Sequence, residues 1–341
     1  MIKFQFPENK STSHIILAAD MGGTKVNIAL FNSTARNPKI LFKEKYFSSD
    51  YASFNDILKD FFKKNPSPTP DCICIGVAGP VINDIAKFTN LHWEISIKGI
   101  RKATGIQKVA LLNDLEATAY GFAYLTKKEF HPLRSAKNDM KGNMVLIAPG
   151  TGLGIAGLSQ HANGHSILSS EGGHSEYAPR SNDDNLLYAH LKAKYKIVSW
   201  EHIVSGKGIK NIYTFLRDIK KMKEEKWLLN MFKTGDMAAV ISEEAFKKKS
   251  AICKHTMKIF IENLARISSS MALIFKATGG VYLCGGIPPK IIDLIEESNF
   301  CKQFLSSDRM NQLLQEIPVH IVLNEETALW GAAYYGTHGI S

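Results

Sequence analysis

The sequence predicts an α/β fold in which one structural unit is duplicated, giving two domains with a cleft between them. The chain has 341 residues, too many for one ordinary core and suited to two domains. Apolar strand patterns alternate with helical patterns, as in other α/β proteins. In each half of the chain, a strand, a glycine turn and a second strand precede the helices.

The composition excludes several classes of protein. With 45% hydrophobic and 22% charged residues, the chain has the profile of a soluble globular protein. Its longest apolar runs, such as 15–19, are far below the roughly 18 residues of a membrane span, and residues 1–14 lack the apolar stretch of a secretory signal. We therefore expect a cytoplasmic protein with no membrane partner. The five cysteines, an odd number with no second pair or histidine cluster at metal-ligand spacing, predict neither disulfides nor a zinc site.

The net charge of +10 invites the hypothesis of nucleic-acid binding. However, the lysines are dispersed, and the densest clusters, 220–226 and 247–249, are mixed with acids or fall on amphipathic stretches. No aromatic residues are interleaved with them for base stacking. A basic, solvated surface that attracts anionic substrates explains the charge better, and we expect no nucleic-acid partner.

The first half of the chain opens with two strands around Gly22-Gly23-Thr24. Ser53 and Asp56 then form an S-x-x-D capping pattern before apolar residues at helical spacing, which predicts a helix. The last expected strand of this half, at 109–112, is followed directly by Asn113-Asp114. The expected strands lie at 14–19, 26–30, 40–47, 72–77 and 109–112.

The second half repeats this plan around the turn at 149–154. A long helix carries an apolar seam from Cys253 to Ile274, which is typical of a core helix. The segment from Gln160 to about Lys249 is predicted to be an insertion in the second copy. The other expected elements are strands at 144–148, 155–158, 281–284 and 318–323, the long helix at 252–275 and a closing helix at 326–335.

Three glycine clusters follow apolar strands, and together they indicate phosphate binding in the cleft. Glycine lets backbone N–H groups approach an anion, and threonine adds a hydroxyl donor. Asp20, before the first cluster, can hold Mg²⁺ directly or through water. A plain hairpin turn remains the alternative for any single cluster. The clusters are Gly22-Gly23-Thr24, Gly150-Thr151-Gly152 with Gly154, and Gly285-Gly286.

Two other glycine motifs match known nucleotide-binding patterns only in part, because the residues around them do not fit. Residues 152–157 match G-x-G-x-x-G, but the dinucleotide fingerprint needs a helix that begins within the glycines, and a short apolar stretch and a turn follow instead. Gly206-Lys207-Gly208 lacks the spacer and the Ser/Thr of a P-loop. Neither a dinucleotide fold nor a P-loop is predicted.

Asn113-Asp114, between a strand and a helix, supplies a candidate base. A carboxylate with an ordinary pKa near 4 is ionised at neutral pH and can accept a hydroxyl proton during phosphoryl transfer. Taken alone, Asp114 is more often a helix N-cap. Further carboxylates, amides and an imidazole suit the recognition of paired sugar hydroxyls, although His174 is also a candidate metal ligand or an ordinary loop histidine. These groups are Asn90, Glu171, His174 and Glu201.

An ordered series of motifs resembles bacterial glucokinases of the hexokinase–actin–Hsp70 superfamily over residues 15–336. The series is more specific than any single motif. It comprises ADMGGTK at 19–25, FTNLHW at 88–93, LLNDLEA at 111–117, PGTGLG at 149–154, SEGGHSEYAP at 170–179, SWEHIVSGKGI at 199–209 and VYLCGGI at 281–287.

The resemblance implies a duplicated ribonuclease-H-like (actin/hexokinase) fold with a catalytic cleft. Residues 1–121 plus 325–341 would form a small domain, and 122–324 a large domain with an inserted segment near 160–250. It also implies a homodimer that uses ATP and Mg²⁺. Asp114 would be the catalytic base, and the other roles would be shared as follows: Asn90, Asn113, Glu171, His174 and Glu201 on glucose, Gly22, Gly23, Thr24, Gly150, Thr151 and Gly152 on the phosphates, and Gly285 and Gly286 on adenosine.

Three departures from related kinases qualify the resemblance. Residues 175–252 contain no cysteine, so the zinc motif of the repressor-like branch is not expected. Lys25 stands where plain glucokinases more often have asparagine, and Glu176 where aspartate is expected. Lys25 would lie beside the phosphates and affect affinity rather than the type of reaction.

We therefore expect transfer of the γ-phosphate of ATP to the 6-hydroxyl of glucose. The first alternative is a kinase for another hexose, such as mannose or an N-acyl hexosamine. A sugar-sensing transcription regulator is disfavoured, because about 13 residues before the first strand are too few for a helix-turn-helix. An actin-like or chaperone-type ATPase would not need the polar cluster assigned to the sugar.

Overall fold

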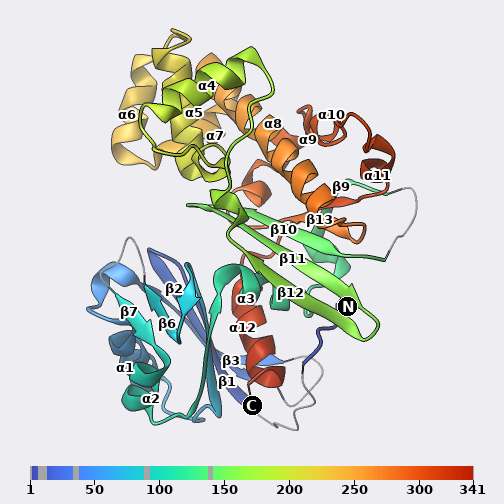
Figure 1. The fold of residues 1–341 in the computed structure, drawn as a ribbon. Helices are drawn as coiled ribbons and strands as arrows, with labels where there is room; N and C mark the ends of the chain where they lie inside the picture. The colour runs from blue at the N-terminus through green and yellow to red at the C-terminus, as the bar shows by residue number, and fades with distance from the viewer. Residues whose placement is uncertain (1, 7–13, 34–37, 88–92, 137–140, 341) are drawn as a thin grey trace. The chain divides into compact units, whose positions relative to one another are not determined.

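The computed structural model describes residues 2–6, 14–33, 38–87, 93–136 and 141–340. The chain forms two compact units (Figure 1). Unit 1 comprises Met1–Lys127, His161–Ile167 and Asn324–Ser341, and unit 2 comprises Lys128–Gln160 and Leu168–Leu323. In the described part of the chain, no helix combines the length and the hydropathy needed to cross a bilayer.

Unit 1 contains a five-stranded sheet with the order β3-β2-β1-β4-β8. The strands β1, β4 and β8 are parallel, and β2 and β3 are antiparallel to their neighbours. The strands of this sheet are β1 (Ile15–Met21), β2 (Lys25–Asn32), β3 (Lys39–Phe47), β4 (Cys72–Val77) and β8 (Lys108–Asn113). A second sheet contains β5 (Val81–Ile82), β6 (Ile85–Lys87) and β7 (Glu94–Ser96), and the helices are α1 (Phe54–Lys64), α2 (Ile97–Thr104), α3 (Asp114–Gly121) and α12 (Thr327–His338).

Alternating apolar residues give this sheet two buried faces. One face packs Leu17 and Ile73 against α1 and α2, and the other packs Ile16 and Cys74 against α3 and α12. The two helices α3 and α12 touch closely, since a Cβ on Gly331 would lie 1.6 Å from the carbonyl oxygen of Ala117. The C-terminal helix therefore completes the core of unit 1.

A six-stranded sheet with the order β12-β11-β10-β13-β14-β9 belongs to unit 2, apart from the last residue of β11 and the first four residues of β12, which fall in unit 1. Its first five strands repeat the order found in unit 1, with β10, β13 and β14 parallel and β11 antiparallel. The strands are β9 (Phe130–Arg134), β10 (Met144–Pro149), β11 (Leu153–His161), β12 (Gly164–Ser170), β13 (Gly280–Leu283) and β14 (Val319–Val322). The sequence predicted four of these six strands and missed β9 and β12.

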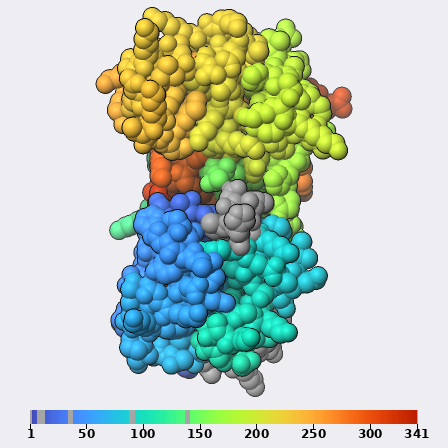
Figure 2. Space-filling view, turned by 90° about the vertical axis from the view of Figure 1, so that its left-hand side faces the viewer, coloured from blue at the N-terminus to red at the C-terminus, as the bar shows by residue number. Residues whose placement is uncertain are grey.

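The helices of unit 2 pack around the long helix α8 (Ala251–Ile274), whose apolar seam is buried from Cys253 to Met271. The prediction was wrong for Ile274, which is 69% exposed because the helix ends there. The predicted insertion contains α4 (Asn182–Lys192), α5 (Gly206–Asp218), α6 (Lys226–Thr234) and α7 (Met237–Phe246), and the short helices α9 (Ile292–Glu296), α10 (Phe300–Phe304) and α11 (Asn311–Gln315) follow α8. Figure 2 shows the insertion as one continuous surface, coloured yellow to yellow-green.

Candidate active site

In unit 1, the predicted site residues gather at one edge of the sheet. Met21 in β1 pairs with Val77 in β4, and Val77 pairs with Asn113 in β8. These three parallel strands therefore end level with one another. At a spacing of about 4.8 Å between neighbouring strands, the ends of β1 and β8 lie about 10 Å apart. The first glycine turn and Asp114 follow the two outer strands of the three. The sheet thus brings together the predicted phosphate turn and the predicted base.

The first glycine turn is held by backbone contacts on both sides. The N–H of Gly22 donates to the carbonyl of Lys25 at 3.0 Å, and the N–H of Ser48 donates to the carbonyl of Thr24 at 3.0 Å. A Cβ built on Gly23 would have none of the described atoms within 4 Å. Packing within the protein therefore does not require glycine at position 23, although a ligand that fills this space would.

The surroundings of Asp20 perturb its titration. Burial raises the pKa of Asp20 to about 6, a hydrogen bond from Asn27 opposes the rise, and the charge of Glu326 adds to it. Glu326 is itself paired with Lys43. A cavity of about 420 Å³ lies beside these residues and is lined by Lys25, Asn27 and Glu326 among others. A cation bound to Asp20 would relieve this crowding of negative charge.

The structure shows which residue of the pair Asn113-Asp114 caps the helix that follows. Asn113, not Asp114, is the N-cap of α3, with a capping box to Glu116. Its Oδ1 accepts the N–H of Leu115 at 2.9 Å, and its Nδ2 donates to the carbonyl of Gly79 at 3.1 Å. Asp114 is half-buried in the first helical turn, and its Oδ1 also accepts the N–H of Leu115, at 2.9 Å. The contacts of Asn113 leave it less capacity for a ligand than the sequence suggested.

In unit 2, the start of α5 and the segment Gly285-Gly286 both lie against the turn at 149–153. The N–H of Gly150 donates to the carbonyl of Gly152 at 2.8 Å, which closes the turn. The N–H of Gly206, at the start of α5, donates to the carbonyl of Gly150 at 2.8 Å. Gly285 has a φ of +79°, and a Cβ there would lie 2.8 Å from the carbonyl oxygen of Pro149. Backbone approach therefore requires glycine at 285, and Gly285-Gly286 lies beside the turn.

Other glycines of these turns are not required by packing. A Cβ on Gly150 or on Gly286 would have none of the described atoms within 4 Å. Neither residue has a left-handed backbone. Together with Gly23, these positions form open spaces of the kind that a closely approaching ligand would fill.

Glu201 joins the predicted sugar-binding set to the second glycine turn. Its Oε2 accepts the N–H of Leu153 at 3.1 Å. A Cβ on Gly152 would lie 2.5 Å from the same oxygen, so this carboxylate explains the glycine. Among the described residues, none donates a hydrogen bond to its Oε1, which leaves that oxygen available for a ligand.

The E-G-G-H segment lies against the same residue, Leu153. It forms the 3₁₀ turn η3 (Gly172–His174), and a Cβ on Gly173 would lie 1.9 Å from the carbonyl oxygen of Leu153. Glu171 Oε2 lies 4.0 Å from His174 Nε2, and both side chains are exposed. Unit 2 therefore gathers Glu171, His174, Glu201 and the glycine turn around one residue.

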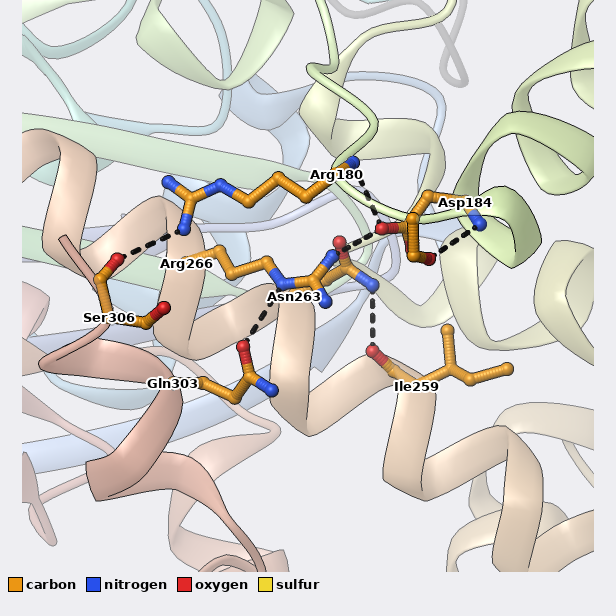
Figure 3. Close-up of polar contacts among 8 residues, drawn as sticks. Arg180, Asp184, Ile259, Asn263, Arg266, Gln303 and Ser306 are labelled. Atoms are coloured by element: carbon orange, nitrogen blue, oxygen red, sulfur yellow. Dashed lines mark hydrogen bonds and ion pairs between the residues drawn. The ribbon is translucent and has the colours of Figure 1, made fainter. Parts of the chain in front are cut away.

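A buried ion pair anchors the chain that follows η3 (Figure 3). Arg266 of α8 donates from Nη1 to Asp184 Oδ2 at 2.6 Å, and the two residues are 8% and 6% exposed. The backbone N–H of Arg180 donates to the same oxygen at 3.0 Å. Burial acts to raise the pKa of Asp184, but the Arg180 amide and Arg266 outweigh it, so the pKa lies below its usual value. Sequence reasoning missed this pair, although an arginine between Ala265 and Ile267 in an apolar helix is a signal for one.

Two further predictions concern Asn90 and the ligands of a metal ion. Asn90 lies outside the described residues, so its place in the site remains a prediction. No group of three or more His, Cys, Asp or Glu side chains in the described ranges is arranged to hold a metal ion by itself. Mg²⁺ at Asp20 would therefore take further ligands from outside such a cluster, as it commonly does from water and substrate phosphates.

Comparisons with known proteins agree with the motif series. A family model described as Glucokinase matches residues 17–338. The glucokinase of Nostoc punctiforme is 35% identical over 333 residues, which cover 94% of this chain and 98% of that protein. The crystal structure of glucokinase from an Antarctic psychrotroph superposes with a TM-score of 0.79 at 29% identity, covering 94% of this chain and 98% of that one. A ROK family glucokinase from Streptomyces griseus, in complex with glucose and AMPPNP, has a TM-score of 0.63 at 18% identity, with 94% and 98% covered, which shows the likeness in fold. The match to the family model over almost the whole chain shows that this protein belongs to the glucokinase family.

Proposed function

We propose that this protein transfers the γ-phosphoryl group of ATP to the 6-hydroxyl of glucose. The observation that carries the proposal is the hydrogen bond from the N–H of Leu153 to Glu201, since it joins the carboxylate that we propose to bind hexose to the turn that we propose to bind phosphate. Membership of the glucokinase family supports the substrate and the donor. The glucose and AMPPNP bound to the ROK family relative add support.

We propose further that the chain has the duplicated ribonuclease-H-like (actin/hexokinase) fold, with a catalytic cleft between a small domain (1–121 plus 325–341) and a large one (122–324). The common strand order of the two sheets supports the duplication. In this arrangement the cleft would unite the unit 1 residues at the ends of β1 and β8 with the unit 2 residues around Leu153. A homodimer, as the family resemblance implies, is part of the same proposal.

The proposed hexose contacts come from both units. In unit 2, the hydroxyls of the hexose would be bound by Glu201 Oε1, Glu171 and His174. In unit 1, they would be bound by Asn113 and Asn90. Carboxylates suit this task because each oxygen can accept from one of two adjacent hydroxyls. The exposure of Glu171 and His174 is consistent with a surface that a ligand would cover.

The proposed phosphate contacts are backbone amides of the two open turns. Gly22, Gly23 and Thr24 would act on one side and Gly150, Thr151 and Gly152 on the other, with Gly285 and Gly286 against adenosine. The open space beside Gly23, Gly150 and Gly286 supports these roles, because a side chain there would occupy the position of the ligand.

Asp114 would act as the base. As the 6-hydroxyl oxygen bonds to the γ-phosphorus, its proton passes to the Asp114 carboxylate, and the bond from phosphorus to the bridging oxygen breaks to release ADP. Mg²⁺, held by Asp20 and the phosphates, would neutralise charge on the phosphates when bound. Excluding water from the site would prevent wasteful hydrolysis of ATP.

A panel of hexoses in a coupled assay of ADP release tests the proposal. Glucose is expected to give the highest kcat/KM, and a sugar that lacks one of the recognised hydroxyls is expected to lose up to about 10⁴-fold. Preference for mannose or an N-acyl hexosamine would identify another hexose kinase. ADP release that is independent of sugar would contradict the proposal and favour an ATPase.

A further inference from the structure

The 3₁₀ turn η4 (Trp200–His202) holds Glu201 between two anchored neighbours. On one side, the N–H of Trp200 donates to the carbonyl of Ser175 at 3.1 Å. On the other side, His202 Nδ1 accepts the backbone N–H of Ser199 at 3.0 Å, and the carbonyl of His202 accepts Asn211 Nδ2 at 2.9 Å. The side chain of His202 thus closes the turn that carries the hexose-binding carboxylate.

This contact fixes the protonation of the imidazole. A backbone N–H can only donate, so Nδ1 must be the unprotonated nitrogen, and neutral His202 carries its proton on Nε2. The residue that donates, Ser199, is 4% exposed, so water cannot easily replace the acceptor. Loss of the acceptor would leave a buried donor unsatisfied at the start of the turn, two residues before Glu201.

The ring is also fixed by stacking. Tyr195 lies parallel to it, with the ring centroids 3.8 Å apart and the planes 15° apart. The ammonium groups of Lys207 and Lys194 lie 4.8 Å and 5.2 Å from the centroid of Tyr195. Two positive charges beside the stacked pair disfavour a third on the imidazole.

The surrounding charges act mainly in one direction. Burial lowers the pKa of His202, and Lys207 lowers it further; Glu201 opposes this, while His174 and Lys194 add to it. These groups come from the turn itself, from η3, from α5 and from the segment after α4. The neutral imidazole, which is the form that can accept from Ser199, therefore persists to a lower pH than in an unperturbed histidine.

We propose that His202 is a positioning residue of the hexose site, which holds Glu201 in place through the acceptor at Nδ1. The inference rests on the proposed function, because it concerns the same site. It predicts that the acceptor, rather than the ring or its charge, is what sugar binding requires.

The test compares His202→Leu, which removes the acceptor, with His202→Asn, whose Oδ1 can take the place of Nδ1. At pH 8, His202→Leu is expected to raise the KM for glucose about 10-fold, the scale of one unsatisfied buried donor, and to change kcat by less than about 3-fold. His202→Asn is expected to stay within about 3-fold of wild type in both constants. His255→Leu, at an exposed position on α8, serves as the control.

The pH profile gives a second measurement, which remains usable if His202→Leu fails to fold. The KM for glucose of the wild type should rise as the pH falls through the lowered pKa of His202, because the protonated ring cannot accept from Ser199. In His202→Asn that component should be missing, so the ratio of the two KM values should change with pH. A constant ratio, or equal impairment of the Leu and Asn variants at pH 8, would overturn the inference.

Failure of the proposed function would look different. If the wild type phosphorylates no sugar, the function is wrong, yet hydrogen exchange at the Ser199 amide still tests the contact. Faster exchange in His202→Leu than in His202→Asn would uphold the role of Nδ1 in fixing the turn. Equal exchange rates would refute it.

Discussion

The Glu201 carboxylate accepts a hydrogen bond from the backbone N–H of Leu153, with Oε2 and N 3.1 Å apart. The two residues are separated by 48 positions in the chain. Leu153 ends the glycine turn at 149–152, and its carbonyl lies where a side chain on Gly173 would have to go. The backbone of the single residue Leu153 therefore contacts both segments proposed to bind hexose, and this residue ends the turn proposed to bind phosphate.

Replacing Glu201 is expected to affect both substrates. In Glu201→Ala, loss of a charged hydrogen bond to the sugar should lower kcat/KM for glucose by about 10²-fold, and the freed turn should raise the KM for ATP. Glu201→Gln keeps an acceptor for Leu153 and should leave the KM for ATP near that of wild type. Steady-state kinetics with each substrate varied distinguish these effects. Glu176→Ala, at an exposed neighbouring carboxylate, is the control, and an equal loss in this variant would argue against a specific role of Glu201.

Asp114→Asn isolates the proposed base. The amide oxygen can still accept the N–H of Leu115, so the start of α3 should be preserved. We expect kcat to fall by at least about 10²-fold, the usual scale of general-base assistance, while both KM values change by less than about 3-fold. Asp308→Asn, at a highly exposed site, controls for loss of charge. A smaller fall in kcat would show that Asp114 is not the general base.

Two glycines of unit 2 should respond in opposite ways to alanine. Gly150→Ala places a methyl group in open space, so the free energy of unfolding should change by less than about 0.5 kcal/mol. The KM for ATP should nevertheless rise, because the methyl group would occupy the space proposed for phosphate. Gly173→Ala should instead destabilise the protein by about 1–3 kcal/mol, since its Cβ would lie 1.9 Å from the carbonyl oxygen of Leu153. Urea denaturation and ATP kinetics of both variants provide the test, and an unaltered KM for ATP in Gly150→Ala would count against this turn as a phosphate site.

Asp20→Asn should stabilise the ligand-free protein while abolishing activity. A carboxylate whose pKa is raised in the folded state, here from 3.8 to about 6, is more easily ionised in the unfolded chain. Its ionisation therefore destabilises the fold as the pH rises from about 4 to 6. The variant should be more stable than wild type by about 2–3 kcal/mol at pH 8, and the difference should vanish near pH 4. Denaturation at several pH values measures this, and an advantage that is independent of pH would show that ionisation is not its cause.

Local patterns predicted where the candidate residues of unit 1 lie relative to its strands. Asp20 lies one residue before the end of β1, and Asn113 ends β8 directly before Asp114; the parallel strands bring these ends to one edge of the sheet. Strands with weaker patterns were missed: β9 contains Pro132, and β12 carries largely polar residues with no fully buried position. The exposure of Ile274 was missed because helical periodicity does not indicate where a helix ends.

The meeting of segments at Leu153 could not be predicted from local pattern. It depends on the packing of η4 and η3 against a turn distant in the chain, and no spacing rule relates Glu201 to position 153. The same limit applies to Asn113, whose side chain is occupied by contacts to Gly79 and Leu115 that only the folded chain creates. The motif resemblance supplied the candidate residues, and only the folded structure shows the contacts that they make.

The ion pair Arg266–Asp184 should be essential to the stability of unit 2 and should take no part in phosphoryl transfer. Arg266→Met would leave the Asp184 carboxylate buried without its main countercharge, a change that typically costs about 3–5 kcal/mol. Replacing both residues, in Asp184→Asn with Arg266→Met, removes the uncompensated charge and should cost less. The exposed pair Lys210–Asp236 is the matched control, and Lys210→Met should cost less than about 1 kcal/mol.

The pH dependence of the Arg266→Met variant identifies the cause. The pKa of Asp184 is lowered in the folded protein, so its contribution to stability is present above the unfolded pKa, near 3.9, and is lost as the pH falls through the lower folded pKa. Without Arg266 the folded pKa should rise, so that protonation relieves the buried charge and the deficit relative to wild type shrinks at acid pH. Urea denaturation between pH 4 and pH 8 measures this deficit. A deficit as small as that of Lys210→Met, or one that does not shrink on acidification, would mean that packing by the arginine stem, and not the ion pair, holds α4 to α8.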